Sequence, residues 1–249
     1  MKRTSPVCLF TILLVAALGC DKQDVTTPYA ELRQLGSYDL AVLEPSGLSL
    51  AEGGAGLYTV SDATNQVFKL ELDGDVLATL EYTGEDLEGV VYDAAGNTLL
   101  VVEEGAREIV TLSTDGQELS RQSLDVPGTS ANSGLEGIAL RDTDHTLFVV
   151  NEKEPARLFR LNADFAVASE HDLQAGIDYS GICHDAISGL LWVVSDQAEV
   201  LFTWDSQSGV RDIFHLPVNK PEGVAVGTDG RIYVVSDADD RLYVFEVPS

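Results

Sequence analysis

Apolar residues in this chain gather in short runs that recur at regular intervals, separated by polar turns rich in glycine. Five runs end in an acidic residue, at 57–62, 99–104, 147–152, 191–196 and 232–237. A glycine followed by an aliphatic residue precedes each run, and these glycines, spaced 42, 48, 44 and 42 residues apart, are Gly47, Gly89, Gly137, Gly181 and Gly223. A period of about 40 to 50 residues with such runs is typical of a β-propeller, one four-stranded blade per repeat.

The ends of the chain predict how the ring closes. The last repeat supplies three strands, at 223–226, 232–236 and 242–247, whereas earlier repeats add a more polar fourth strand at 76–82, 118–126, 167–173 and 210–216. Residues 37–42 precede the first repeat and would complete the last blade, which removes two exposed strand edges. The sequence therefore predicts an all-β, five-bladed propeller of four-stranded antiparallel blades. The alternative, six blades with one degenerate, leaves no residues for the sixth.

The N-terminal residues have the layout of an export signal. Lys2 and Arg3 precede an apolar stretch at 7–18, and Cys20 follows a small residue. Cys20 in that position resembles the lipidated cysteine of bacterial lipoproteins; the alternative is an ordinary signal peptide with an incidental cysteine. We expect a signal at 1–19, a lipidated Cys20 with a polar tether at 20–30, and one propeller domain at 31–249. Asp21 favours the inner membrane, with the domain facing the periplasm; an exterior location is the other option.

Charge narrows the class of partner. The chain carries a formal charge of −26 at pH 7, which argues against nucleic acid as a partner and repels the domain from anionic lipid. Apart from the anchor at Cys20, we expect a monomer that recognises a small molecule or an envelope protein. Such a charge belongs either to a solvated acidic surface or to a protein that binds cations.

The repeat places many of the acids on one face of the disc. The first strand of each blade starts at the glycine and the second runs antiparallel to it, so residues before the glycine and after the second strand share a face. Before the glycines stand Glu44, Glu88, Glu136 and Glu222. After the second strands stand Asp62, Glu103, Glu104, Glu152, Asp196 and Asp237. Ser180 replaces the glutamate in the fourth repeat, and Glu44 is displaced by two residues, so one sector of the ring is expected to admit a ligand.

A ring of glutamates at the mouth of a channel is costly, because glutamate disfavours strands and like charges repel. A bound cation would compensate this cost. Oxygen ligands without cysteine or paired histidine favour Ca²⁺, with Mg²⁺ second. We therefore expect the four glutamates to be metal ligands and the remaining acids, with Ser180, to form a ligand-binding rim. The alternative for each aspartate is that it caps a turn.

Other candidate groups are weaker. His184 aligns with apolar residues at the far end of the first strand, which predicts a packed side chain. Trp192 and Trp204 lie on second and third strands, where packing between blades explains them. No Ser/His/Asp set can be assembled on one face.

Several motifs together resemble one family. These are the lipoprotein-like N-terminus, Glu44-Pro-Ser-Gly47, Asp86-Leu-Glu-Gly89, Gly134-Leu-Glu-Gly137 and the run ends Ser61-Asp62, Glu103-Glu104 and Asn151-Glu152. The combination resembles the SdiA-regulated (YjiK-like) family of bacterial envelope propellers. The resemblance implies a five-bladed propeller tied to the envelope, a cation site in the channel and no established reaction. Two functions stay open: a tethered binding module, or a metal-dependent hydrolase of the lactonase-like or phytase-like propeller type.

Overall fold

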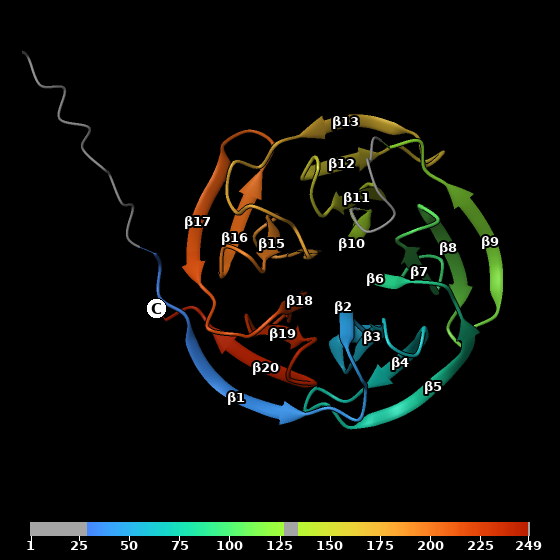
Figure 1. Ribbon diagram of the computed structural model, residues 1–249, viewed down its shortest axis with the longest axis horizontal. Coiled ribbons are helices and arrows are strands. Elements are labelled where there is room, and N and C mark those ends of the chain that lie inside the picture. The colour runs from blue at the N-terminus through green and yellow to red at the C-terminus, as the bar shows by residue number, and fades with distance from the viewer. Residues whose placement is uncertain (1–28, 127–133, 249) are drawn as a thin grey trace, which may run out of the picture.

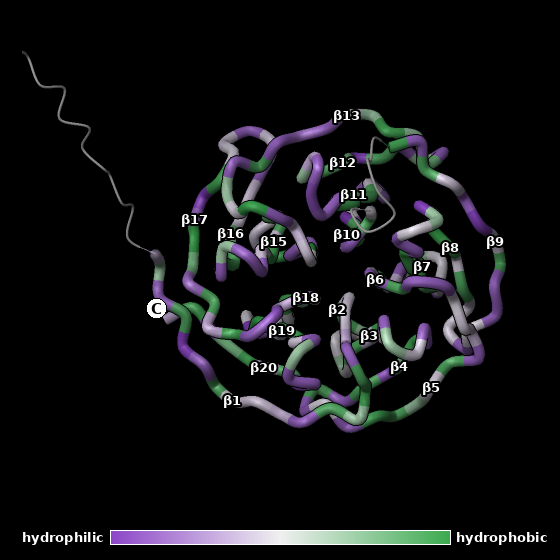
Figure 2. The backbone as a smooth tube through the Cα atoms, viewed as in Figure 1, coloured by the Kyte–Doolittle hydropathy of each residue, from purple (hydrophilic) through white to green (hydrophobic). Residues whose placement is uncertain are grey.

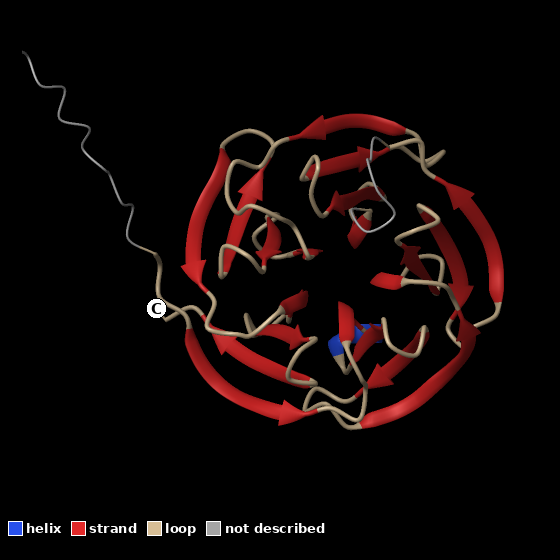
Figure 3. Ribbon diagram, in the orientation of Figure 1, coloured by secondary structure: helices blue, strands red, loops and turns tan. Residues whose placement is uncertain are grey.

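The computed structural model describes residues 29–126 and 134–248, and these form a ring of five four-stranded sheets (Figure 1). Figure 3 shows that the described residues are almost entirely strands and loops, with one short 3₁₀ helix, η1 (Glu52–Gly54). No helix in the described ranges has the length and hydropathy needed to cross a membrane. Our predictions of a signal, a lipidated Cys20 and a tether concern residues outside these ranges, except for residues 29 and 30.

Each blade is an antiparallel sheet. In blades 1 to 4 the strands run in sequence order from the axis outward, whereas blade 5 has the N-terminal strand at its outer edge. Blade 1 contains β2 (Pro45–Leu50), β3 (Leu57–Ser61), β4 (Gln66–Leu70) and β5 (Val76–Thr83). Blade 2 contains β6 (Leu87–Asp93), β7 (Thr98–Glu103), β8 (Glu108–Ser113) and β9 (Glu118–Ser123). Blade 3 contains β10 (Leu135–Arg141), β11 (Thr146–Asn151), β12 (Arg157–Leu161) and β13 (Val167–His171). Blade 4 contains β14 (Gly181–His184), β15 (Leu191–Ser195), β16 (Val200–Asp205) and β17 (Gly209–His215). Blade 5 contains β18 (Pro221–Val226), β19 (Ile232–Ser236), β20 (Arg241–Glu246) and β1 (Arg33–Asp39).

The N-terminal strand closes the ring, as the sequence predicts. β1 pairs antiparallel with β20, with Ser37 opposite Tyr243 and Tyr38 opposite Leu242. The strand begins and ends earlier than the predicted 37–42, because the chain turns inward after residue 39 to reach blade 1. Leu40 and Val42 are therefore buried in the core between blades 5 and 1 instead of extending the sheet.

Apolar side chains fill the spaces between neighbouring blades. Each of the five hydrophobic clusters joins the facing sides of two adjacent sheets, so the core is a ring of five wedges. The second strands are buried except for Thr98 at the start of β7, whereas all six residues of the outer strand β9 are exposed. Figure 2 shows the consequence, with polar residues frequent at the perimeter and in the loops. The uniformly apolar runs are thus second strands, with neighbours on both faces.

The repeating glycines mark the level at which the inner strands come closest to one another. A Cβ atom on Gly47 would lie 2.6 Å from the backbone nitrogen of Val90 in the next blade, and one on Gly89 would lie 2.8 Å from the carbonyl oxygen of Glu136. The same holds around the ring, where a side chain on Gly181 would overlap the Glu222 carbonyl. Only glycine permits this approach, which explains why the period is so clear in the sequence. We call this level the glycine waist.

Candidate functional site

The residue before the glycine occupies a β-bulge. In β10, Leu135 pairs with Asn151 and Gly137 with Val150, so that Glu136 has no partner of its own in the ladder. β6 has the same shift around Glu88. A bulge bends the strand and redirects the side chain of the extra residue. This local irregularity directs the carboxylates into the channel mouth and frees them from the packing that governs the rest of the strand.

Three glutamates and two serines share this position around the axis. They are Ser46, Glu88, Glu136, Ser180 and Glu222. The Ser46 hydroxyl donates a hydrogen bond to Glu88, with 2.5 Å between Oγ and Oε2. The Ser180 hydroxyl instead donates to the carbonyl of Pro221 at 2.8 Å. The innermost ring therefore has carboxylates from blades 2, 3 and 5 and hydroxyls from blades 1 and 4.

Glu44 belongs to a different ring. It stands three residues before its glycine, as do Asp86, Asp178 and Lys220 in their repeats. Glu44 is exposed, and its carbonyl accepts a hydrogen bond from the backbone N–H of Asp62 at 3.1 Å. Glu44 is thus displaced by two residues from the position that Ser46 occupies, and it lies outside the innermost ring. The sequence carried the correct signal, since alignment on the glycines places these residues in one column.

The last residue of each second strand and the acid that follows it have different roles. The last strand residue is a buried serine in three blades, and its hydroxyl anchors the loop above it; for example, Ser61 donates to the Leu43 carbonyl at 2.6 Å. Ser61 also accepts a hydrogen bond from the N–H of Thr64 at 3.0 Å. The serine rather than Asp62 therefore caps this turn. The following acid in each blade is left facing the mouth.

Glu103 lies apart from the mouth residues. It occupies the in-strand position that is serine in blades 1, 4 and 5, and its carboxylate is buried on the side of blade 2. It accepts a hydrogen bond from the Tyr82 hydroxyl at 2.6 Å and pairs with Arg121 at 2.5 Å. Successive residues of a strand point to opposite faces, so of the predicted Glu103–Glu104 pair only Glu104 reaches the mouth.

The acidic residues enclose a cavity of about 290 Å³. Ten acids and two lysines line it, together with Ser46 and Ser180: Glu44, Asp62, Glu88, Glu104, Glu136, Glu152, Asp178, Asp196, Glu222, Asp237, Lys153 and Lys220. We call this cavity the acidic mouth. It includes every predicted site residue in the described ranges except Glu103. Lys153 forms an ion pair with Glu152, with 2.5 Å between Nζ and Oε1, and Lys220 forms one with Asp237. The two lysines therefore neutralise the charge of only two of the ten acids.

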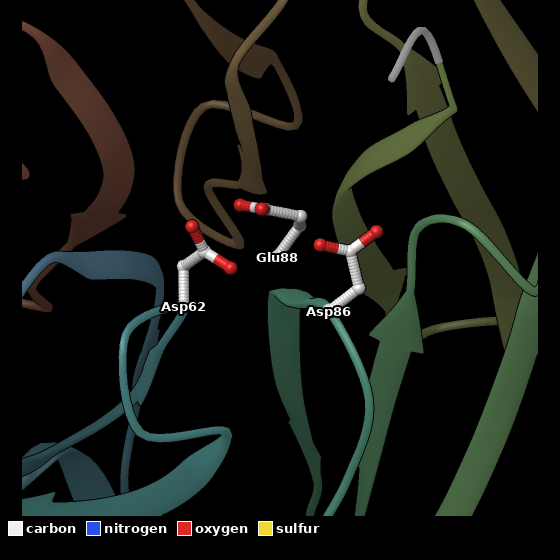
Figure 4. Close-up of side chains that lie close together, drawn as sticks. All are labelled: Asp62, Asp86 and Glu88. Carbon is white, nitrogen blue, oxygen red and sulfur yellow. The ribbon is translucent and has the colours of Figure 1, made fainter. Parts of the chain in front are cut away.

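Two sets of carboxylates are close enough to share an ion. The first comprises Asp62, Asp86 and Glu88, at the junction of blades 1 and 2, where the three carboxylates approach one another (Figure 4). The second comprises Glu104, Glu136 and Glu152, at the junction of blades 2 and 3. Within each set, one oxygen from every residue lies within 4.8 Å of the others. Glu136 is 8% exposed, so the second set is centred on a buried carboxylate.

Burial and mutual repulsion raise the pKa values of carboxylic acids in the mouth. Burial, followed by the carboxylates of Glu88 and Glu222, raises the pKa of Glu136 well above its usual value. Burial is also the main cause that raises the pKa of Glu88 to about 8 and that of Glu104 to about 7. Carboxylates in this state are stabilised either by a proton or by a cation.

The other end of the channel has the opposite character. A cavity of about 320 Å³ lies beyond the glycine waist and is lined mainly by apolar residues of the inner strands, among them Leu48, Val91, Ile138, Ile182 and Ala225. We call this cavity the apolar mouth. His184 also lines it and is partly buried, in agreement with the prediction of a packed side chain.

Solved structures with the same fold include several enzymes. A gluconolactonase from Xanthomonas campestris is 16% identical, with a TM-score of 0.57 over 88% of this chain and 90% of that one. A streptogramin B lyase is 19% identical, with a TM-score of 0.52 over 88% and 74%. A luciferin-regenerating enzyme is 15% identical, with a TM-score of 0.54 over 87% and 95%. At these identities the likeness establishes the propeller fold alone.

A family model described as SdiA-regulated matches residues 38–246. The match begins near the end of β1 and ends with β20, so it includes all the residues that line the acidic mouth. It agrees with the resemblance seen in the sequence motifs.

Proposed function

The chain belongs to the SdiA-regulated family, and we propose that its acidic mouth binds a divalent cation and thereby recognises a ligand or partner in the cell envelope. The observation that carries this proposal is the buried carboxylate of Glu136, which lies within 4.8 Å of the carboxylates of Glu104 and Glu152. Carboxylates crowded together at a buried site repel one another. A cation shared by the three removes that cost.

The coordination chemistry favours Ca²⁺ over Mg²⁺. Ca²⁺ takes about six to eight oxygens at roughly 2.3–2.6 Å in a flexible arrangement, whereas Mg²⁺ requires a near-ideal octahedron at about 2.0–2.1 Å. Carboxylates that come from different blades, as in each set, meet the flexible requirement more readily.

We propose further that the propeller is a monomer held at the envelope through a lipid on Cys20. The support is the sequence around that residue, with a short apolar stretch and a small residue before the cysteine. Cys20→Ser should release the protein from membranes into the soluble fraction, because one short apolar signal is not otherwise a stable anchor. A variant that stays with the membrane would contradict the lipid anchor, and its behaviour leaves the cation proposal untouched.

The cation proposal is tested by thermal unfolding and calorimetric titration of the purified domain. A cation that binds only the folded ring stabilises it by about 2.7 kcal/mol at a hundredfold excess over Kd. The melting temperature should therefore rise with millimolar Ca²⁺, rise less with Mg²⁺ and fall with chelator. Glu136→Gln should abolish the response, whereas Glu170→Gln on the exposed strand β13 should retain it. A response that is absent in the wild type, or unchanged in Glu136→Gln, would overturn the proposal.

A second candidate function is metal-dependent hydrolysis of the lactonase-like or phytase-like type. The specific observation in its favour is that Glu88 and Glu104, whose pKa values lie at about 8 and about 7, share the acidic mouth with Lys153 and Lys220. Groups that titrate near neutral pH suit general acid–base catalysis beside a metal that polarises an oxygen. A screen of lactones and phosphate monoesters with added Ca²⁺ tests it. Turnover that disappears in Glu88→Gln would support catalysis, and turnover in neither protein would leave binding alone.

A further inference from the structure

We propose that a groove between blades 3 and 4 binds a small organic anion that carries a planar apolar group. This groove has a volume of about 570 Å³ and opens at the side of the apolar mouth, away from the acidic mouth. Residues of β10 to β13, in blade 3, line one side of the groove. Residues of β15, β16 and the turn after β16, in blade 4, line the other side. The inference is independent of the cation proposal.

The groove concentrates positive charge in a strongly acidic protein. Arg141, Arg160 and Arg211 all line it, and Asp205 is the only acid in its lining. In the acidic mouth, by contrast, ten acids face two lysines. A guanidinium presents several donors in one plane, which suits a carboxylate or a phosphate.

Some of these donors are unused by the protein. Arg160 lies opposite Phe148 in the ladder between β11 and β12, and its guanidinium forms no hydrogen bond or ion pair with a described side chain. Arg141 binds Asp144 through Nε and Nη2, both at 2.8 Å, and this contact fixes the orientation of the guanidinium. Arg211 lies 3.6 Å from Asp205. An incoming anion therefore meets one unpaired arginine and two whose positions are already set.

Aromatic side chains form the wall beside these arginines. The indole of Trp204 is 6% exposed and lies 5.2 Å from the ring of His171, measured between centroids. The guanidinium of Arg141 lies over the ring of Phe148 at 5.3 Å. Flat apolar surface next to cationic groups suits a ligand with a planar ring attached to its charge.

His184 adds a polar atom between the groove and the apolar mouth. Its Nε2 is buried and has no hydrogen-bond partner, although the great majority of buried polar atoms are paired. His184 lines the groove as well as the apolar mouth. A ligand that reaches this nitrogen would complete its hydrogen bonding.

The net charge of the protein limits the size of the ligand. A polyanion would be repelled by the charge of −26. A compact ligand with one anionic group is attracted by the arginines at short range and is repelled less at long range. The groove, at about 570 Å³, accommodates a molecule of that size.

The two tryptophans provide a direct test. Trp192 packs against Phe214 between blades 4 and 5, so Trp192→Phe leaves Trp204 as the sole reporter of the groove. Phenyl phosphate is titrated in chelator, so that no metal in the acidic mouth contributes, with benzyl alcohol as the neutral comparison. We expect a saturable change in Trp204 emission with phenyl phosphate only. Arg160→Gln should weaken binding about tenfold, the loss of one charged hydrogen bond, while Arg231→Gln should not.

The wild-type protein provides a second measurement if Trp192→Phe folds poorly. Phenyl phosphate should raise its melting temperature, and Arg160→Gln should remove most of that increase. The proposal is overturned if phenyl phosphate changes neither the emission nor the melting temperature. It is also overturned if Arg160→Gln binds as tightly as the parent, or if benzyl alcohol binds equally well.

Discussion

The two mouths of the channel are built from the same five strands, yet one is lined by carboxylates and the other by aliphatic side chains. In β10 the difference spans two residues, from Glu136 above the glycine waist to Ile138 below it. Above the waist the strand is bulged and its residue is free of the ladder; below it every residue is paired and packed. In blades 1, 2, 3 and 5, a single register shift in the first strand thus separates the residues that face the acidic mouth from those that pack in the core.

The largest effect is expected from a carboxylate introduced on the apolar side of the glycine waist. Ile138→Glu places a carboxylate at a site 2% exposed, where no described cation lies nearby, and should destabilise the protein by about 3 to 5 kcal/mol. Glu136→Gln, two residues away, should raise stability in chelator because it removes a repelled charge. Denaturant unfolding measures both. An Ile138→Glu variant with the stability of the wild type would show that the apolar mouth is as well hydrated as the acidic mouth.

The glycine waist should be nearly as sensitive. Gly181→Ala puts a methyl group onto the Glu222 carbonyl, an overlap that only a shift of backbone can relieve. We expect a loss of about 3 kcal/mol, at the upper end for overpacking, and weaker Ca²⁺ binding because the acidic mouth widens. Gly36→Ala in β1 is the matched control, since the nearest atoms there belong to the mobile end of Tyr38. Equal stability of the two variants would contradict a tight waist.

The acidic mouth predicts an unusual pH dependence for the metal-free protein. The pKa of Glu88 is about 8 in the folded state, above its ordinary value of 4.5, so between these values the folded state binds more protons than the unfolded state. The free energy of unfolding should therefore fall as pH rises from about 5 to 8, by up to about 1.4 kcal/mol per pH unit for each such group. Saturating Ca²⁺ should flatten or reverse this slope. Denaturant unfolding at four pH values, with chelator or Ca²⁺, provides the comparison.

The smallest effect is expected at the apolar mouth, where Cys183 lies. Burial raises the pKa of the Cys183 thiol, so little thiolate is present at neutral pH. Iodoacetamide should modify it far more slowly in the folded protein than in denaturant, as mass spectrometry of the peptide containing residue 183 would show. Calcium should leave this rate unchanged, because the waist lies between the two mouths. A Ca²⁺-dependent rate would mean that the mouths are coupled.

The sequence was sufficient to predict the five-bladed ring, but it predicted only part of the acidic mouth. Apolar runs and glycines repeat in phase because each blade must pack against the next, and five-fold architecture with terminal closure follows from them. Glu88, Glu136 and Glu222 were found because they precede those glycines. The glycine period therefore locates the innermost ring of the site as well as the blades.

The outer parts of the mouth depend on features that the periodicity does not record. Which acid of the Glu103–Glu104 pair reaches the mouth depends on where β7 ends, a matter of one residue. Asp178 and Lys220 lie in loops of differing composition, so their common position three residues before the glycine is visible only after alignment of the repeats. The bulge itself arises from backbone contacts across the ring, which no local pattern encodes.

The glycine waist also fixes how many copies of the repeat the fold accepts. Five inner strands touch at backbone distance because each glycine hydrogen fits against the neighbouring blade. A sixth copy inserted by duplication would lengthen the circumference and hold these strands apart, leaving an open axis where the glycines no longer have contacts. Duplication of a blade would therefore need larger residues at all the glycine positions at once. The same small residues that make the repeat easy to recognise thus hold this ring at five blades.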